Sequence, residues 1–258
     1  MTAPLLEFEH VGLSFKGVKA LTDVSFTVNE GELFAVIGPN GAGKTSTFNC
    51  LNGVYKPQEG DIRWRGESLL GVSPDRIAAL GIARTFQNIE LFAHMTVLEN
   101  ITLGRHVRTS GGWLSGAVWW GAAKREEMEN RAKVEGIIDL LEIESWRKYP
   151  VGLLPYGIQK RVELGRALAM APELLLLDEP VAGMNLEETE DMARFILDIR
   201  QELGIAMILV EHDMGLVMDI ADRILVLDFG QVIGQGTPME VQNNPNVIKA
   251  YLGEELDL

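Results

Sequence analysis

Cysteine is nearly absent from this sequence: Cys50 is the only one among 258 residues. One thiol cannot form an internal disulfide, and no basic segment followed by an apolar run is readable near the N-terminus. No stretch reaches the roughly 20 apolar residues that a membrane-crossing helix needs. We therefore expect a chain that is soluble by itself and that resides in the reducing cytoplasm.

Positive charge is scarce as well. Lysine and arginine together number 23 against 37 aspartates and glutamates, which gives a net charge of -14. Because affinity for nucleic acids depends mainly on clustered lysine and arginine, nucleic acid is excluded as the expected partner. Internal repeats, low-complexity tracts and Ser/Pro-rich linkers are also missing. With 47% hydrophobic residues, we expect one catalytic unit, built on one large core or on a core with a smaller satellite lobe.

Short apolar runs alternate with helical periods, which indicates an α/β fold: a largely parallel sheet with helices on its faces. Runs this short, bounded by Gly, Pro, Asp or His, are typical of strands that are buried on both sides. Polar residues follow the C-terminal ends of these runs, where ligands bind in open α/β sheets. The four predicted strands are residues 33–37, 174–177, 205–210 and 224–227.

Two other regions show different patterns. Residues 5–28 alternate apolar and polar positions, with turn signals at 16–17 and 29–31, which predicts an antiparallel β layer. Residues 88–159 are helical in pattern without a core strand, which predicts an inserted helical lobe. We therefore expect one domain over residues 1–258, with a core formed by residues 1–87 and 160–258.

A phosphate-loop pattern, G-x-x-x-x-G-K-[ST], follows the first predicted strand and opens a predicted helix. Glycines let the backbone curl around phosphates, and N–H groups at the helix start supply positive potential. Lys44 is expected to hold the β- and γ-phosphates and Thr45 to place its hydroxyl on magnesium, while Ser46 supports the next turn. The loop consists of Gly38, Pro39, Asn40, Gly41, Ala42, Gly43, Lys44 and Thr45.

The second predicted strand runs into two acids, Asp178 and Glu179. Phosphoryl transfer needs positioning and charge stabilisation more than covalent chemistry. Asp178 is therefore expected near the magnesium ion, and Glu179 is expected to polarise the attacking water as the general base. Together with the phosphate loop, this pair predicts a site that hydrolyses a nucleotide.

These motifs resemble the ATP-binding-cassette ATPase family, and the match covers almost the whole chain. The resemblance implies a RecA-like phosphate-loop NTPase core, an antiparallel β layer and an inserted α-helical signature subdomain. It also implies that Phe15 stacks on adenine, although a core position in the β layer is the alternative. Gln87 resembles the family glutamine that touches magnesium and the attacking water, and His212 resembles the histidine that contacts the γ-phosphate.

Residues 154–159, L-P-Y-G-I-Q, resemble the family signature L-S-G-G-Q. In the family this helix start caps the γ-phosphate that a second subunit binds, so Tyr156, Gly157 and Gln159 are expected at a partner's nucleotide. Pro155 stands where the signature has serine, and it offers neither a hydroxyl nor an N–H to phosphate. We therefore hypothesise that this signature forms the weaker of two composite sites in a heterodimer.

Several further segments resemble the larger ATPase of branched-chain amino-acid importers, and they recur partly in urea importers and in the lipopolysaccharide-exporting ATPase. A tryptophan-containing insertion around residues 111–123 favours the amino-acid group. Its uncharged stretch, with Trp113, Trp119 and Trp120, is interpreted either as a packed loop or as an amphipathic patch facing a partner or a membrane surface. The resembling segments are residues 81–88, 91–92, 95–100, 156–157, 182–185 and 251–253.

The resemblance implies an ATP-hydrolysing importer subunit at the cytoplasmic face of the inner membrane, with ATP and Mg2+ as cofactors. Its implied partners are transmembrane permease subunits, a second cassette ATPase and, indirectly, an extracytoplasmic solute-binding protein. The permease is expected near Gln87, where Phe86, Leu91, Phe92 and Met95 either receive a short helix or are core residues. Alternatives are a cassette ATPase for another cargo (urea, lipopolysaccharide or another lipid), a soluble one acting on DNA or ribosomes, and a regulator without turnover.

Overall fold

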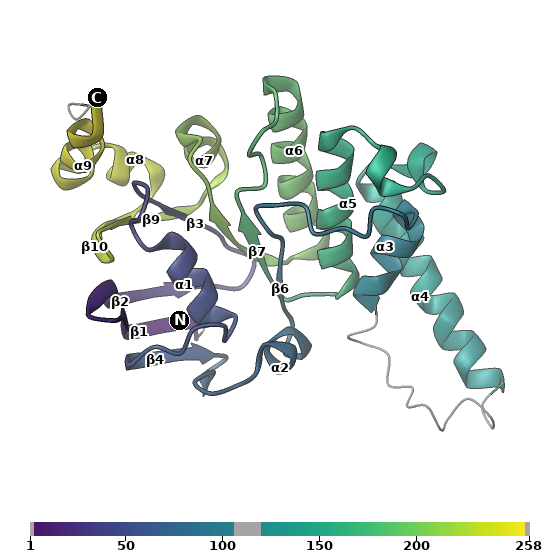
Figure 1. Cartoon of the computed structure of the whole chain (residues 1–258), viewed down its shortest axis with the longest axis horizontal. Helices are drawn as coiled ribbons and strands as arrows, with labels where there is room; N and C mark the ends of the chain where they lie inside the picture. Colours follow the sequence, from purple (N-terminus) through teal and green to yellow (C-terminus); the bar gives the residue numbers. More distant parts are fainter. Residues whose placement is uncertain (1–2, 106–119, 256–258) are drawn as a thin grey trace.

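The computed structural model describes residues 3–105 and 120–255. A six-stranded sheet lies at the centre, and helices cover one of its faces (Figure 1). A four-stranded sheet lies on the other side, with helix α1 (Lys44–Leu51) packed between the two sheets. The chain therefore forms layers around the central sheet, as the alternation of strands and helices predicts.

The central sheet has the strand order β10-β9-β3-β8-β7-β6. Its strands are parallel except β10, which pairs antiparallel with β9 at one edge. All four predicted core strands are confirmed, each within one residue of its expected ends. The short edge strands β6 and β10 were not predicted. The bounds are β3 Leu33–Ile37, β6 Ile82–Arg84, β7 Leu174–Asp178, β8 Ala206–Val210, β9 Arg223–Asp228 and β10 Gln231–Gly236.

The second sheet is the predicted antiparallel layer, with the order β2-β1-β4-β5. Lys16 and Gly17 form the turn between its first two strands with φ of 47° and 89°, the left-handed values that a two-residue hairpin turn favours. Two further strands join the layer from residues beyond α1. The strands are β1 Leu6–Phe15, β2 Val18–Val28, β4 Glu59–Trp64 and β5 Glu67–Ser68.

The helices begin and end at the expected capping signals. Thr96 with Glu99 and Thr237 with Glu240 form capping boxes, and Gly204 ends α6 in the left-handed conformation. Besides α1 the helices are α2 Pro74–Ala79, α3 Val97–Gly104, α4 Trp120–Leu140, α5 Tyr156–Ala169, α6 Leu186–Leu203, α7 Met214–Ile220, α8 Pro238–Gln242 and α9 Pro245–Glu255. Two 3₁₀ turns, Glu144–Trp146 and Val151–Leu153, precede α5.

The central sheet separates two hydrophobic cores because successive side chains of a buried strand point to opposite faces. In β3, Leu33, Ala35 and Ile37 face the core that the helices α3 to α7 complete. Phe34 and Val36 face the core that contains α1 and the antiparallel layer. Both faces of the sheet are therefore covered, as its uninterrupted apolar strands predict.

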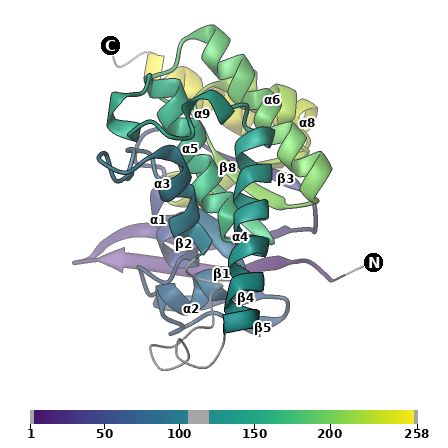
Figure 2. The ribbon, with the colours of Figure 1, turned by 90° about the vertical axis from the view of Figure 1, so that its right-hand side faces the viewer.

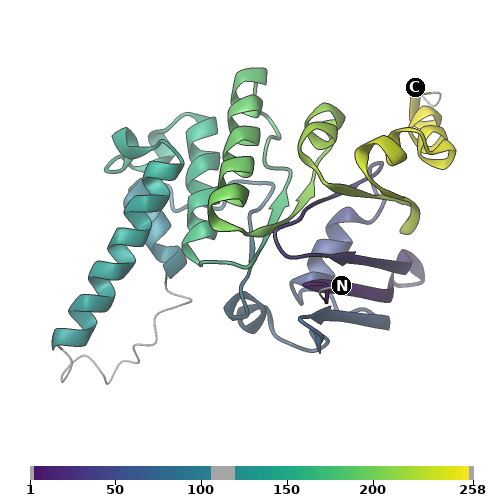
Figure 3. The same ribbon diagram turned by 180° about the vertical axis from the view of Figure 1, so that it is seen from behind.

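Residues 88–159 contain α3, α4 and the two 3₁₀ turns, and no strand of either sheet occurs in the part of this stretch that the structure describes. Figure 2 shows α4 running alongside α3 and α5, and Figure 3 shows the same helices from behind. Helix α5 continues across the predicted boundary at 159/160, so the division into subdomains stays a prediction. Trp113 and Trp119 lie outside the described residues.

Within residues 3–105 and 120–255, none of the helices combines the length and the apolar character that crossing a membrane requires.

Gly104 brings α3 and α5 into close contact. A Cβ at this position would lie 2.2 Å from the backbone oxygen of Arg166 in α5, so Gly104→Ala forces the two helices apart. We expect this variant to lower the free energy of unfolding by about 1–3 kcal/mol, measured by urea denaturation.

Gly136 in α4 is the matched control, because a Cβ there meets nothing within 4 Å. Gly136→Ala is expected to raise the free energy of unfolding by about 0.5–1 kcal/mol, since alanine loses less backbone entropy in a helix. Equal stabilities for the two variants would contradict the close packing of α3 on α5.

Candidate nucleotide site

The predicted phosphate loop runs from the end of β3 into α1. Gly38, Gly41 and Gly43 have φ of 147°, 79° and 105°, which other residues rarely adopt. Gly38 also lacks room for a side chain, because a Cβ there would lie 2.0 Å from the backbone oxygen of Leu227. The glycines therefore allow the tight curve that brings backbone N–H groups to a phosphate.

Lys44 is the first residue of α1 and is buried against the loop. Its Nζ donates to the backbone oxygens of Gly38 and Pro39 at 2.6 and 2.9 Å. Thr45 beside it is exposed and Ser46 is half-buried. The helix thus places a buried ammonium group against the loop backbone and an exposed hydroxyl group beside it.

Asp178 ends β7 and is joined to Arg84, the last residue of the neighbouring strand β6. Arg84 Nη2 donates to Asp178 Oδ2 at 2.5 Å, and Arg84 Nη1 donates to Asn49 Oδ1 of α1 at 2.8 Å. The Arg84 guanidinium lies 5.4 Å from the ring centroids of both Phe48 and Phe86. Arg84 therefore connects β6, β7 and α1 directly beside the predicted metal ligand.

Two other predicted catalytic residues, Gln87 and His212, contact Glu179. Gln87 Nε2 donates to Glu179 Oε2 at 2.6 Å, and His212 Nε2 lies 2.9 Å from Glu179 Oε1. The backbone of Glu179 is left-handed, with φ of 49°, and its N–H donates to Val210 of β8 at 2.9 Å. Both carboxylate oxygens therefore have a partner from a different loop at the same edge of the sheet.

Glu211 supports this arrangement from below the surface, with 3% of its area exposed. Its Oε1 accepts from the Val181 N–H and its Oε2 from the His212 N–H, each at 3.0 Å. Burial raises the pKa of the Glu211 carboxyl, while these N–H donors act in the opposite direction. Glu211 thereby ties the loop after β7 to the loop after β8.

The predicted signature residues open α5, with Pro155 at the N-cap and no side-chain cap. Tyr156 Oη donates to the backbone oxygen of Ala182 at 3.0 Å. Gln159 Nε2 donates to the backbone oxygen of Leu154, just before the helix, at 2.8 Å. Gly157 is buried beside α6. Figures 1 and 3 show α5 and α1 in different parts of the molecule. This separation is what a nucleotide bound by a second subunit requires.

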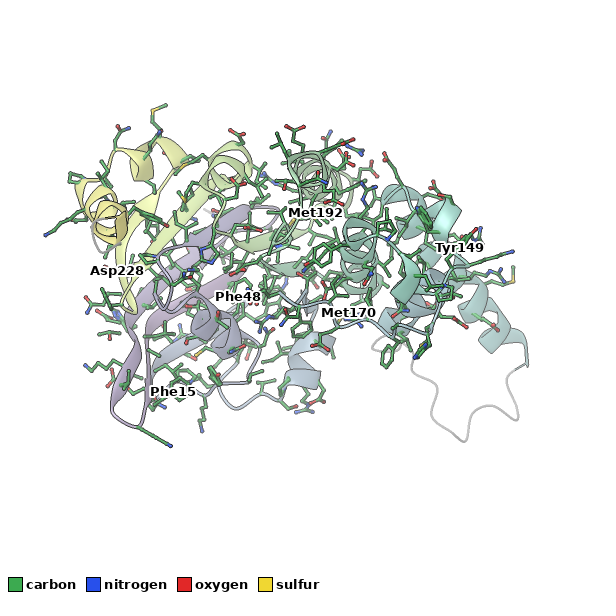
Figure 4. All side chains as sticks on the ribbon, turned by 45° about the horizontal axis from the view of Figure 1, so that its top comes forward. Phe15, Phe48, Tyr149, Met170, Met192 and Asp228 are labelled. Carbon is green, nitrogen blue, oxygen red and sulfur yellow. The ribbon has the colours of Figure 1, made fainter. Side chains whose placement is uncertain are left out.

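Phe15 lies near the tip of the β1–β2 hairpin, whereas Phe48 lies at the centre of the molecule (Figure 4). The Phe15 side chain is 44% exposed and meets the Tyr55 ring edge-on at 4.9 Å between centroids. A buried core position in the β layer is therefore excluded, and the ring is accessible to a planar ligand.

The predicted metal ligands are suited to magnesium, because all of them are oxygen atoms. The three ligands are the Thr45 hydroxyl, the Asp178 carboxylate and the amide oxygen of Gln87. The amide nitrogen of Gln87 donates to Glu179. Across residues 3–105 and 120–255, no group of three or more His, Cys, Asp or Glu is arranged to hold a metal. One carboxylate together with neutral oxygen ligands suits Mg2+, which usually keeps several water ligands and binds the phosphate oxygens of the substrate.

A pocket of about 510 Å³ separates the phosphate loop from the C-terminal helix α9. Phe229, in the turn between β9 and β10, is 83% exposed and has φ of 42°. The C-terminal segment therefore borders the nucleotide site. The pocket is lined by Pro39, Asn40, Gly41, Ala42, Asp228, Phe229, Ile233, Asn246, Lys249 and Ala250.

Two residues of the site received no role from the sequence. Glu211 follows a predicted strand directly, as Asp178 and Glu179 do, so the same signal marks it. Arg84 ends a strand of three residues, which is too short to show a pattern. Its role depends on Asp178, 94 residues away, and no local signal marks that pairing.

Comparison with known families agrees with this geometry. The family model described as "ABC transporter" matches residues 21–182, which is more than half of the chain. The chain therefore belongs to the ABC transporter family and is an ATP-binding cassette ATPase. A second model, described as "Branched-chain amino acid ATP-binding cassette transporter", matches residues 231–257, the segment that borders the phosphate loop.

Similar proteins cover the chain almost from end to end. It is 40% identical to the high-affinity branched-chain amino acid transport ATP-binding protein BraF of Pseudomonas aeruginosa, over 98% of this chain and 100% of BraF. Its identity to LivG of Escherichia coli K12, which carries the same description, is 39% with the same coverage. The crystal structure of an ADP-bound ATP-binding cassette superposes with a TM-score of 0.84 at 29% identity, covering 98% of this chain and 100% of that one. The predicted fold class and family are thereby confirmed.

Arg84→Met leaves the Asp178 carboxylate without its cation. Because these side chains are only 11% and 8% exposed, we expect the free energy of unfolding to fall by about 1–3 kcal/mol, measured without nucleotide.

Arg63→Met is the control, because Arg63 also pairs with a carboxylate, that of Glu9 at 3.1 Å, but with side chains that are 39% and 40% exposed. We expect a loss of about 0–1 kcal/mol there. A loss at Arg84 no larger than that at Arg63 would contradict a tight connection between β6 and β7.

Proposed function

We propose that this chain is the ATP-hydrolysing subunit of an importer for branched-chain amino acids, acting on separate permease subunits. The meeting of Gln87, Glu179 and His212, at the sheet edge where the phosphate loop also begins, is the observation that carries the catalytic part. The cargo is supported by BraF and LivG, which are named for branched-chain amino acids. The match at residues 231–257 supports the same cargo.

In this proposal, Lys44 and the loop N–H groups bind the β- and γ-phosphates of ATP. Thr45, Asp178 and the amide oxygen of Gln87 hold Mg2+, which neutralises phosphate charge when it is bound. Glu179 accepts the proton of the attacking water. His212 holds the γ-phosphate, and Phe15 stacks on the adenine.

The hydrogen bonds at Glu179 connect the proposed catalytic base to nucleotide binding. Both oxygens of the carboxylate are engaged, by Gln87 and by His212. Each carboxylate oxygen keeps a second lone pair that can accept a proton from water, so these bonds orient the Glu179 carboxylate and do not block it. Contact of His212 with the γ-phosphate would replace its bond to Glu179 Oε1, so ATP binding would leave that oxygen to the attacking water. Gln87 Nε2 would stay on Oε2 while its amide oxygen faces the metal.

A second cassette subunit completes the site in this proposal. Tyr156, Gly157 and Gln159 would face the γ-phosphate held by that subunit, where the start of α5 is favourable for an anion. Pro155 lacks both a hydroxyl and an N–H, so this chain would contribute the weaker signature of a heterodimer.

The permease is proposed to dock on an exposed apolar patch of the helical region. Phe86 and Phe92 are 43% and 58% exposed, which excludes core positions for them. Tyr149 and Leu153, which are 53% and 78% exposed, come from a loop joined to that of Phe92 by backbone hydrogen bonds. Figure 4 shows Tyr149 at the end of the molecule opposite Asp228. Docking here would hold the chain at the cytoplasmic face of the membrane, with the solute-binding protein reached only through the permease.

Glu179→Gln keeps the shape of the side chain but removes its basicity. In the complete transporter we expect ATP binding to persist while the ATPase rate falls about 10²–10⁴-fold, because a general base is lost. Glu187→Gln, at an exposed position in the first turn of α6, is the control and should keep the parental rate. Ordinary multiple turnover by the Glu179 variant would overturn the proposed base.

Affinity purification from gently solubilised membranes tests the transporter. We expect to recover two permease subunits and a second cassette ATPase with this chain. Reconstituted in liposomes with the binding protein, that assembly should take up leucine only when ATP is present on the cassette side. Recovery of soluble or ribosomal partners alone would overturn the transport function while leaving ATP hydrolysis intact.

A further inference from the structure

Two opposite charges lie buried side by side within α5. Lys160 and Glu163 are 3% and 2% exposed, and Lys160 Nζ lies 3.5 Å from Glu163 Oε2. Removing two charges from water costs several kcal/mol per ion, which their mutual attraction offsets only when the remaining hydrogen-bonding positions are also filled. The question is therefore which groups fill them.

Both charged groups bond to the backbone of the segment that contains Gln87. Lys160 Nζ donates to the oxygens of Phe86 and Gln87 at 3.2 and 2.8 Å. The Phe86 N–H donates to Glu163 Oε1 at 3.4 Å. Burial raises the pKa of the Glu163 carboxyl, and the Lys160 ammonium and these backbone donors act against that rise.

The same face of α5 holds the segment further along. Arg166 Nη1 donates to the backbone oxygen of Glu90 at 2.5 Å. Lys160, Glu163 and Arg166 are spaced three residues apart, so they lie on neighbouring turns of one helix face. Residues 86–90 are therefore attached to α5 along their main chain, whatever side chains they carry.

We infer that Lys160 and Glu163 form a clamp that positions Gln87 against Glu179. This inference rests on the proposed function, because it assigns a purpose to the Gln87–Glu179 contact. Helix α5 begins at the signature, which the proposal places on the nucleotide of the second subunit. The clamp then makes the position of Gln87 depend on the position of α5, so that closure of the two subunits is felt at the catalytic base.

Single substitutions are poor tests of the clamp, because each leaves one buried charge without its partner. The informative variant removes both charges together, as Lys160→Met with Glu163→Leu. In the complete transporter we expect kcat for ATP to fall about tenfold, since a small misplacement of a catalytic group slows the reaction. The KM for ATP and the thermal unfolding midpoint should stay close to parental values. Lys160→Gln with Glu163→Gln, which keeps hydrogen-bonding groups at both positions, should recover most of the rate.

A double-mutant cycle with Gln87→Ala shows whether the clamp acts through Gln87. If it does, adding Lys160→Met and Glu163→Leu to Gln87→Ala should slow the enzyme by less than about twofold, because coupled sites are not additive. A further tenfold loss in that background would overturn the inference. A parental rate in the variant that carries Lys160→Met and Glu163→Leu alone would overturn it as well.

Two controls separate this inference from the proposed function. Arg147→Met with Glu135→Leu removes an ion pair between α4 and the turn before α5 and should leave kcat unchanged, which excludes a general effect of lost ion pairs. Glu179→Gln and Gln87→Ala are assayed in parallel. Parental rates in both would overturn the proposed catalytic site and the clamp together, whereas low rates in both with additive behaviour in the cycle would overturn the clamp alone.

Discussion

Strand β7 pairs in parallel with β6 on one side and β8 on the other, and the arrangement of the site depends on this pairing. Arg84 of β6 lies opposite Leu176 of β7, and Asp178 lies opposite Val210 of β8. Because successive side chains point to opposite faces, a slip of one residue would turn Asp178 away from its partner and exchange the two cores. The register of β7 in the sheet therefore also determines where the side chain of Asp178 points.

Charge at this edge of the sheet is balanced locally before any nucleotide arrives. Asp178 is paired with Arg84, and Glu211 accepts two backbone N–H groups. Isolated buried charges would destabilise the fold, so each one is held in a defined position by its partners. Under the proposed function, a site organised in this way would need little rearrangement when phosphate and metal enter, which is the main advantage of a preorganised polar environment.

Helix α5 connects parts of the molecule that are far apart in the chain. It packs against α3 and α4, and through Lys160 it holds the main chain of Phe86 and Gln87. Tyr156 at its start bonds to the loop after β7. One helix therefore contacts two of the three segments that meet at Glu179, which agrees with the buried charges that it carries where a purely packing helix would have apolar residues.

The sequence by itself determined the features that depend on neighbouring residues. The glycines of residues 38–45, the capping boxes and the four apolar strands are local patterns, and so is the pair Asp178-Glu179 after a strand. Resemblance to the family added Gln87 and His212. The tertiary structure alone decided that Arg84 reaches Asp178, that Lys160 and Glu163 hold the main chain of Phe86 and Gln87, and that the three-residue strand β6 joins the central sheet. These contacts join segments about 70 to 95 residues apart, and neither periodicity nor spacing in one sequence records which distant segments meet.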